Sequence, residues 1–336
     1  MKFTGNIYYK GKMRRGTLCV GNNIIEFIDR ISNNALNGTI IPMPVNAHIH
    51  TGDSFISAEP EGSLPEIVGP GGLKHRELER ASKKTIIGGI SNSNRYMEDI
   101  GTLAYFDFRE SGLSGISMAS NARKRYIRPV ILGRPYKTDN IENIIDGSDG
   151  FGLSSISDIE YEEAKNTSEI AIKKHKIMAL HFSENIREDI DKILDLKPDL
   201  LIHGIAAEID DLNKIRQRHI PVAITPRSNI FYGKRPDYGK FIKSGIELML
   251  GTDNVFITEP DIFSEMDFLY RYQRFKTYIS PGQIMNFAID NPLKFLEKAG
   301  IKVSMKYIYF KNVYLNEYQI VTKRHYFKSK NIINFE

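Results

Sequence analysis

Two histidines, His48 and His50, end an apolar stretch that reads Val-Asn-Ala-His-Ile-His. On a β-strand the side chains of residues i and i+2 point to the same face, so both imidazoles can reach one point. Imidazoles are common ligands of divalent transition metals. The pair alone is a weak sign, because a lone histidine at a strand end is more often a hydrogen-bonded structural residue.

Three further apolar runs end in residues of the same chemical kind. Residues 177–180 lead into His181, with Glu184 three positions later; residues 200–202 lead into His203; and residues 248–250 lead through Gly251 and Thr252 into Asp253. The purely structural explanation would have to hold at each of these strand ends in succession. The pattern therefore favours one shared site at one edge of a sheet.

Short apolar strands alternate with amphipathic helices through the centre of the chain. Strands are expected at residues 40–47, 103–108, 127–132, 150–153, 177–181, 200–203, 222–224 and 248–251, with helices such as 159–174 and 186–196 between them. Eight strand–helix units predict an α/β fold, a (β/α)8 TIM-type barrel over residues 44–300, with its active site at the carboxyl ends of the strands. An open doubly wound sheet is the alternative.

Both ends of the chain have strand-like patterns. Residues 8–16 and 19–23 predict strands and a hairpin, residues 33–38 predict a turn, and residues 306–326 have apolar side chains at strand-like spacing. The simplest organisation is one small β domain built from both termini, residues 1–43 plus 301–336.

One long segment, residues 51–76, interrupts the strand–helix alternation. It is rich in glycine and proline and directly follows the first barrel strand. A long loop at that end of a barrel predicts a lid over the mouth, and a mobile surface loop is the alternative. Its Gly-Pro-Gly-Gly run is not a phosphate loop, because no Gly-Lys-Ser/Thr follows.

Composition narrows the possible partners and compartments. The chain has 336 residues, a formal net charge of +5 spread along its length, and one cysteine, Cys19. A single cysteine excludes an internal disulfide and a cysteine-rich zinc module, so a metal would be held by His, Asp or Glu. With no apolar run of about 20 residues and no signal-peptide pattern, we expect a cytoplasmic protein without membrane or nucleic-acid partners, acting on a small molecule. The sequence is compatible with a homo-oligomer.

Five motifs in order resemble those of the amidohydrolase superfamily, with most likeness to its cytosine-deaminase-like and chlorohydrolase-like branch. They are VNAHIH, HFSE, LIHG, TPRSN and GTDN. The segments GDSFISAEPEGSLPEIVGPGGLKHREL and FDFRESG look like an archaeal group of that branch. The resemblance covers almost the whole barrel, and the terminal segments fit the small β-sandwich usual in this branch. The C-terminal part lacks the Gly-x-x-Ala-Asp-Leu signature.

The resemblance implies one divalent metal ion, with Zn²⁺ favoured and Fe²⁺ as the alternative. Its ligands would be His48, His50, His181 and Asp253. Such an ion lowers the pKa of bound water toward neutrality, and Asp253 can accept the proton. Glu184 would be the proton shuttle, and His203 would lie beside the water or substrate. Two-metal relatives carry a carboxylated lysine or a glutamate at the fourth strand, and residues 150–155 contain neither.

These roles together predict an aminohydrolase that deaminates an aminated heterocycle such as a pyrimidine or purine. The alternatives are hydrolysis of a cyclic amide or a C–Cl bond on the same scaffold and, more distantly, a non-catalytic protein of this fold. A cytidine-deaminase zinc site is excluded because it needs several cysteines. Candidate substrate contacts follow the second and seventh strands, and Arg134 follows the third, although salt bridges at the barrel rim are the alternative for each arginine. The substrate-contact candidates are Arg109, Glu110, Arg227 and Asn229.

Overall fold

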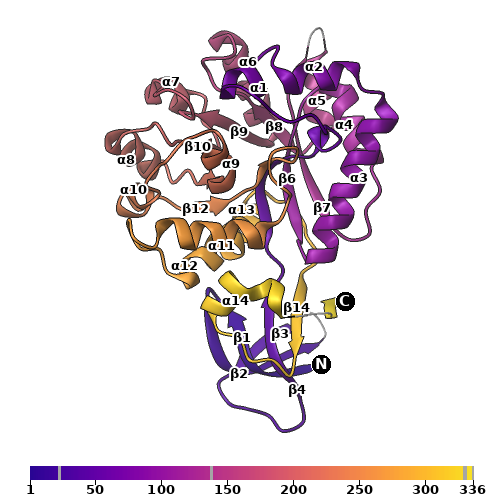
Figure 1. Cartoon of the computed structure of the whole chain (residues 1–336), viewed down its shortest axis with the longest axis vertical. Coiled ribbons are helices and arrows are strands. Elements are labelled where there is room, and N and C mark those ends of the chain that lie inside the picture. Colours follow the sequence, from indigo (N-terminus) through magenta and orange to yellow (C-terminus); the bar gives the residue numbers. More distant parts are fainter. Residues whose placement is uncertain (22–23, 137–138, 328–330, 335–336) are drawn as a thin grey trace.

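The computed structural model describes residues 1–21, 24–136, 139–327 and 331–334, and its strands form two sheets. Figure 1 shows the larger sheet with its helices in the upper part of the molecule and the smaller sheet below, where both termini lie. No described helix is long and apolar enough to cross a membrane.

The larger sheet is a curled, parallel sheet in which strands consecutive in sequence are neighbours. Its side chains are almost all buried, as expected for strands covered on both faces. Its strands are β5 (Val45–His50), β6 (Ala104–Arg109), β7 (Arg128–Gly133), β8 (Gly150–Leu153), β9 (Ile177–Phe182), β10 (Leu200–His203), β11 (Val222–Ile224), β12 (Leu248–Leu250) and β13 (Asp253–Asn254).

The last barrel strand is split into two short pieces. β12 pairs with β11, and β13 pairs with β5. Between them, the amide of Thr252 donates to the carbonyl of His48 at 2.9 Å. The eighth strand therefore joins the first, which confirms the TIM-type barrel and removes the open-sheet alternative.

Helices cover the outside of the barrel (Figure 1). Between successive strands lie α3 (Lys83–Ile100), α4 (Gly112–Asn121), α5 (Ile141–Asp146), α6 (Tyr161–Lys174), α7 (Ile190–Asp195), α8 (Ile209–Gln217), α9 (Pro226–Phe231) and α10 (Gly239–Lys243). After the last strand come α11 (Ile262–Gln273), α12 (Pro281–Ala288) and α13 (Asp290–Lys298). Predicted helices 159–174 and 186–196 correspond to α6 and α7.

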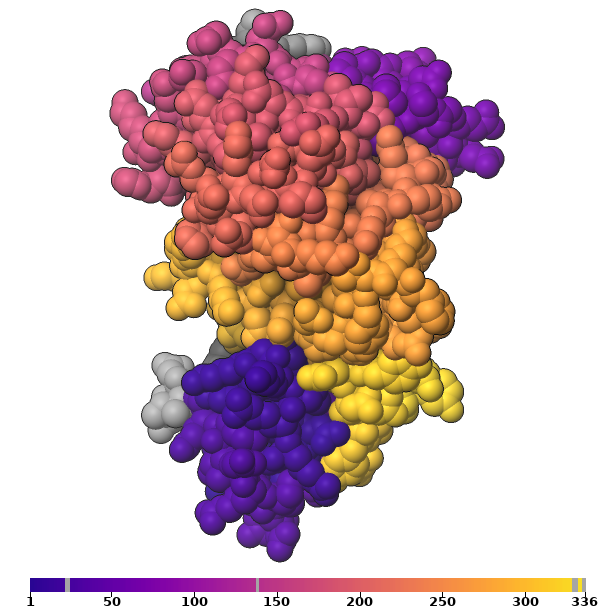
Figure 2. Space-filling view, turned by 90° about the vertical axis from the view of Figure 1, so that its left-hand side faces the viewer, coloured from indigo at the N-terminus to yellow at the C-terminus, as the bar shows by residue number. Residues whose placement is uncertain are grey.

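The smaller sheet takes strands from both ends of the chain, as the sequence predicted. Its order is β15-β14-β4-β1-β2-β3, so β4 lies between an N-terminal and a C-terminal strand. The strands are β1 (Lys2–Tyr9), β2 (Lys12–Gly21), β3 (Ile24–Ile28), β4 (Leu36–Pro42), β14 (Lys306–Lys311) and β15 (Asn331–Asn334). In Figure 2 the N-terminal strands and the C-terminal segment lie side by side beneath the barrel. The strand expected at 19–23 is present to Gly21; residues 22–23 lie outside the described residues.

The predicted bounds of two strands were wrong. The strand expected at 40–47 is two strands, β4 and β5, that belong to different sheets and are separated at Met43 and Pro44. The continuous strand pattern expected over 306–326 ends with β14, and α14 (Glu317–Lys323) follows. The Asn316 side chain caps α14 by accepting from the amide of Gln319 at 2.9 Å, which favours a helix there.

The segment expected to be a long loop is interrupted by short helical pieces. Residues 51–76 contain a 3-10 turn (Thr51–Asp53), α1 (Leu64–Val68) and the start of α2 (Leu73–Arg80). Ser63 begins α1 with a capping box closed by Glu66. Leu64 and Val68, four residues apart, share one face of α1.

Candidate metal centre and active site

The carboxyl ends of four barrel strands bring the predicted site residues together. The ring centroid of His48 lies 4.9 Å from that of His50 and 4.8 Å from that of His181. The Nε2 atoms of His48 and His50 lie 3.4 and 3.5 Å from Asp253 Oδ1. Sequence reasoning thus chose residues that converge on one point, although they are up to about two hundred positions apart.

The close approach of Asp253 to His48 depends on the turn between β12 and β13. Asn46 donates from Nδ2 to Thr252 Oγ1 at 2.7 Å and accepts from the Thr252 amide at 3.1 Å. At Gly251 a Cβ atom would lie 2.7 Å from the Cβ and amide nitrogen of His48, so only glycine fits. Asp253 itself has a φ of 66° and accepts from Ser228 Oγ at 2.6 Å.

Carbonyl, carboxylate and hydroxyl oxygens hold three of the imidazoles through Nδ1. His50 Nδ1 lies 2.7 Å from Glu110 Oε1 and 3.1 Å from the Phe108 carbonyl. His181 Nδ1 lies 2.7 Å from the carbonyl of Leu153, and His203 Nδ1 lies 3.1 Å from Thr225 Oγ1. Such contacts fix the ring orientation and leave Nε2 available to a metal or a ligand.

Burial sets the protonation of these groups. Burial lowers the pKa of His48 to about 3, and it also lowers the pKa values of His50 and His181. Burial acts to raise the pKa of Asp253, but the neighbouring imidazoles, His48 first, outweigh it and hold that pKa well below its usual value. Neutral imidazoles beside an ionised carboxylate are the forms that bind a cation.

The described residues contain two overlapping groups with atoms close enough to share an ion. They are His48, His50 and His181, and His48, His203 and Asp253. Within these residues, both ring nitrogens of His48 are buried without a hydrogen-bond partner. A buried imidazole in that state is costly unless a ligand satisfies it, so the donor set fits a divalent metal.

Glu184 lies next to this centre and outside both groups. Its Oε2 is 3.5 Å from His203 Nε2, and its side chain is 17% exposed. Burial raises the pKa of Glu184, which favours the protonated form. A carboxyl group placed so can give or take a proton beside the ion.

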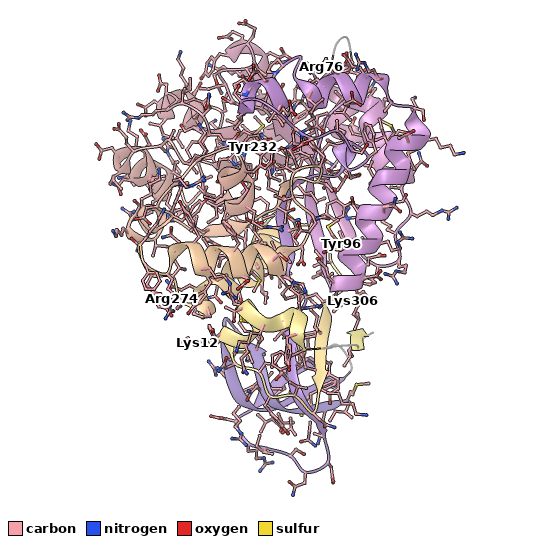
Figure 3. All side chains as sticks on the ribbon, in the orientation of Figure 1. Lys12, Arg76, Tyr96, Tyr232, Arg274 and Lys306 are labelled. Carbon is pink, nitrogen blue, oxygen red and sulfur yellow. The ribbon has the colours of Figure 1, made fainter. Side chains whose placement is uncertain are left out.

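A small cavity of about 90 Å³ opens onto these residues. Leu64, Val68 and Gly69 form one of its walls, so the segment from 51 to 76 covers the site. Tyr232, labelled at the centre of the barrel in Figure 3, lines it as well, and its buried hydroxyl has no partner among the described residues. The cavity is lined by His50, Leu64, Val68, Gly69, Lys74, Arg134, Ser154, Ser155, Asp158, His181, Glu184, His203, Tyr232, Asp253 and Asn254.

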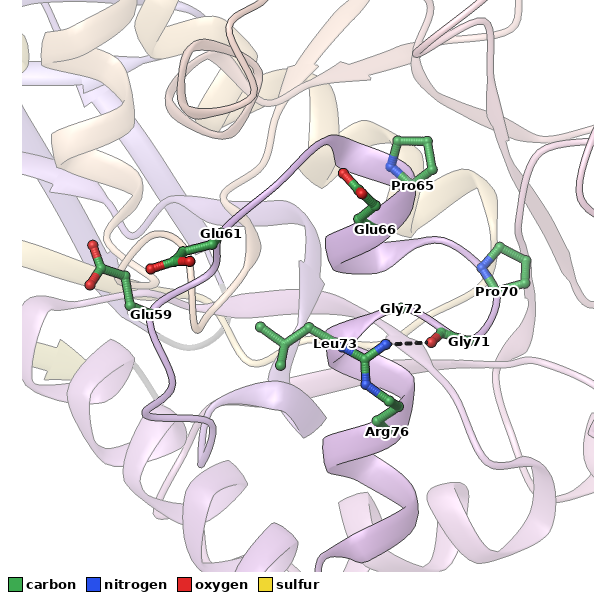
Figure 4. Close-up of a pocket in the computed structure, with 9 residues that line it drawn as sticks. All are labelled: Glu59, Glu61, Pro65, Glu66, Pro70, Gly71, Gly72, Leu73 and Arg76. Atoms are coloured by element: carbon green, nitrogen blue, oxygen red, sulfur yellow. Dashed lines mark hydrogen bonds between the residues drawn. The ribbon is translucent and has the colours of Figure 1, made fainter.

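A larger hollow of about 650 Å³ is lined by other residues of the same segment. Figure 4 shows its lining, which includes Glu59, Glu61 and Glu66, and the hydrogen bond of 2.8 Å from Arg76 to the Gly71 carbonyl. It contains none of the converging histidines. The segment therefore contributes lining residues both to this hollow and to the buried cavity.

None of the four residues expected to contact substrate lines the buried cavity. Arg109 is 1% exposed and donates to Glu110 Oε2 at 2.8 Å, while Glu110 lies behind His50. Arg227 pairs with Glu265 and Glu259, and Asn229 accepts from the Tyr238 hydroxyl at 2.8 Å.

Sequence reasoning missed Lys74 and Tyr232. Lys74 is 3% exposed and forms an ion pair with Glu110, and its Nζ lies 3.8 Å from Asp53 Oδ2. Its position just after the Gly-Pro-Gly-Gly run was the only available sign. Tyr232 follows the TPRSN motif by a few residues, and no spacing distinguishes it from a packing tyrosine.

Relatives of the chain were found by sequence, although no protein-family model matches it. An uncharacterized protein of Methanocaldococcus jannaschii is 32% identical over 86% of this chain and 83% of its own length. A candidate aminohydrolase of Archaeoglobus fulgidus is 32% identical over 68% of each chain.

Solved structures share the fold at low identity. An adenosine deaminase of Xanthomonas campestris with bound zinc superposes with a TM-score of 0.78, at 12% identity, over 99% of this chain and 91% of its own. An aminofutalosine deaminase of Helicobacter pylori, in complex with methylthio-coformycin, gives 0.74 at 15% identity over 99% and 98%. With its archaeal aminohydrolase relative, its barrel and its converging histidines, the chain belongs to the amidohydrolase superfamily.

Proposed function

We propose that the protein is a mononuclear metal-dependent aminohydrolase that removes ammonia from an aminated heterocycle. The observation that carries the proposal is the convergence of His48, His50, His181 and Asp253 with the acid Glu184 beside them. The archaeal relative named as a candidate aminohydrolase, and the deaminases that share the fold, support a C–N bond as the target.

The metal ligands proposed are His48, His50, His181 and Asp253. When bound, a divalent ion lowers the pKa of a coordinated water so that the water can act as a nucleophile near neutral pH. Zinc is the favoured ion and ferrous iron the alternative, because both accept imidazole and carboxylate ligands. The fourth barrel strand, β8, has the sequence Gly-Phe-Gly-Leu and offers no side chain to bridge a second ion.

The remaining residues of the site transfer protons or donate hydrogen bonds. Asp253 accepts the proton of the attacking water, and Ser228 keeps its other oxygen in place. Glu184 protonates the ring nitrogen next to the carbon under attack. Asp253 then passes the proton it took from the water to the departing amine, and the hydroxyl left on the carbon gives its remaining proton back to Glu184 as the carbonyl forms. His203 donates from Nε2 to the oxygen that develops charge, while Thr225 orients its ring.

The test combines metal analysis with turnover. The purified protein should bind one equivalent of zinc or iron and release ammonia from a member of a panel of aminated pyrimidines, purines, pterins and triazines. Glu184→Gln should keep the metal and lose about 100-fold or more in kcat, because it removes a proton donor and no ligand. If the protein hydrolysed a cyclic amide and released no ammonia from any compound of the panel, the proposed reaction would be amide hydrolysis and not deamination. If the purified protein bound neither zinc nor iron, the proposal that it is a metal-dependent enzyme would be refuted.

A further inference from the structure

An arginine in the cavity wall next to β7 and β8 has no ion-pair partner among the described residues. Arg134 lines the cavity, and its Nε donates to the Gly152 carbonyl at 3.3 Å. It forms no ion pair within 4.0 Å with any carboxylate of the described chain. Its two terminal amino groups are therefore free to donate to a ligand in the cavity.

The two buried cations near the site, Arg109 and Lys74, are neutralised. Burial would lower the pKa of Arg109, but Asp107 and Glu110 outweigh it and raise that pKa. Lys74 pairs with Glu110 and approaches Asp53. For Arg134, by contrast, burial lowers the pKa and the more distant Glu110 and Asp158 do not compensate.

Because Arg134 lines the cavity without an ion-pair partner among the described residues, we infer that the substrate carries an anionic substituent, a carboxylate, which Arg134 binds while the aminated ring carbon faces Asp253. The inference rests on the proposed function and narrows its substrate class. A guanidinium offers a planar pair of donors that matches a planar carboxylate, and the pair is strong where water is excluded. Uncharged heterocycles would leave this half-buried cation without an ion-pair partner among the described residues.

The size of the cavity restricts the rest of the molecule. Its volume of about 90 Å³ is well below the roughly 300 Å³ at the lower end of ordinary ligand sites. So small a space favours a single-ring heterocycle with a carboxylate over a two-ring system or a nucleotide. Leu64 and Val68 supply the apolar wall for the ring face.

The experiment uses matched ligand pairs. Cytosine is compared with 5-carboxycytosine and with its 5-carboxamide, pterin with pterin-6-carboxylate, and cytidine with its 5′-monophosphate. Binding to the metal-loaded protein is measured by calorimetry, and turnover by ammonia release. The variants are Arg134→Met and, as a matched control on the exposed face of α3, Arg95→Met.

A carboxylated member should bind about 100-fold more tightly than its carboxamide, and Arg134→Met should remove that difference while Arg95→Met keeps it. Carboxylates that bind no better than carboxamides, or a preference unchanged in Arg134→Met, would overturn the inference. Tighter binding of the monophosphate would overturn the choice of carboxylate. Arg134-dependent binding of carboxylates without any ammonia release would support the anion site while refuting the proposed deamination.

Discussion

Replacing Glu110 by glutamine tests how much the contact of Glu110 with the proposed ligand His50 contributes to metal affinity. Glu110 Oε1 lies 2.7 Å from His50 Nδ1, and Glu110 also pairs with Lys74 from the segment that covers the cavity. Removing such a supporting partner of a ligand commonly costs 10- to 100-fold in metal affinity. Because the Phe108 carbonyl, 3.1 Å away, still holds the same nitrogen, we expect the lower part of that range, about 10- to 30-fold, or roughly 1.4–2 kcal/mol.

The assay is a competition between the apoprotein and a chromophoric chelator for zinc at fixed pH. Glu162→Gln, an exposed change on α6, is the matched control and should leave the affinity unchanged. Circular dichroism checks that the fold is kept. An affinity within twofold of wild type would mean that the Phe108 carbonyl alone orients His50. A loss as complete as that of a ligand variant would mean that Glu110 binds the ion itself.

Three further predictions separate ligands, supports and structural ion pairs. His181→Ala should lose zinc while His203→Asn keeps it, with the distant His175→Ala as control; equal loss in both variants would place His203 on the ion. Burial acts to raise the pKa of Glu98, but hydrogen bonds from Arg125 and the amides of residues 125–127 outweigh it and hold the pKa below 4.5. The stabilisation is therefore present above the ordinary carboxyl pKa and is lost as the pH falls through the lowered pKa of the folded state. Chemical denaturation should show Glu98→Gln less stable by roughly 2–3 kcal/mol at pH 7, with the gap closing at acidic pH. Arg227→Met should lower the free energy of unfolding by about 3 kcal/mol with KM unchanged, since it leaves Glu265 buried and unpaired; a raised KM with normal stability would restore Arg227 as a substrate contact.

The barrel could be predicted because its strands are short apolar runs that end abruptly in polar residues. Buried parallel strands require such runs, and their carboxyl ends carry the site. The run over 40–47 misled because apolar residues continue through Met43 and Pro44, where the chain passes from one sheet to the other. Near the C-terminus, aromatic and β-branched residues favoured a strand, whereas the cap at Asn316 and the burial of Ile320 and Val321 against the barrel produce a helix.

The convergence of the candidate ligands was predictable because each ends or closely follows an apolar run. His48 and His181 lie near the carboxyl ends of β5 and β9, Asp253 begins β13 shortly after β12, and the closed sheet brings these positions together. Lys74 reaches the site only because the segment between β5 and α3 folds back over the mouth. Arg109 and Arg134 follow neighbouring strands in the same way, and only the tertiary arrangement of carboxylates separates the neutralised arginine from the free one.

The position of β4 between β1 and β14 affects how the chain is made. A ribosome releases β1 to β4 and then the entire barrel before it reaches β14. Throughout that time one edge of β4 has no partner strand, and an open edge is a template for pairing with another chain. The N-terminal strands therefore have an exposed edge prone to aggregation during synthesis, and this edge is covered only when β14 has been made.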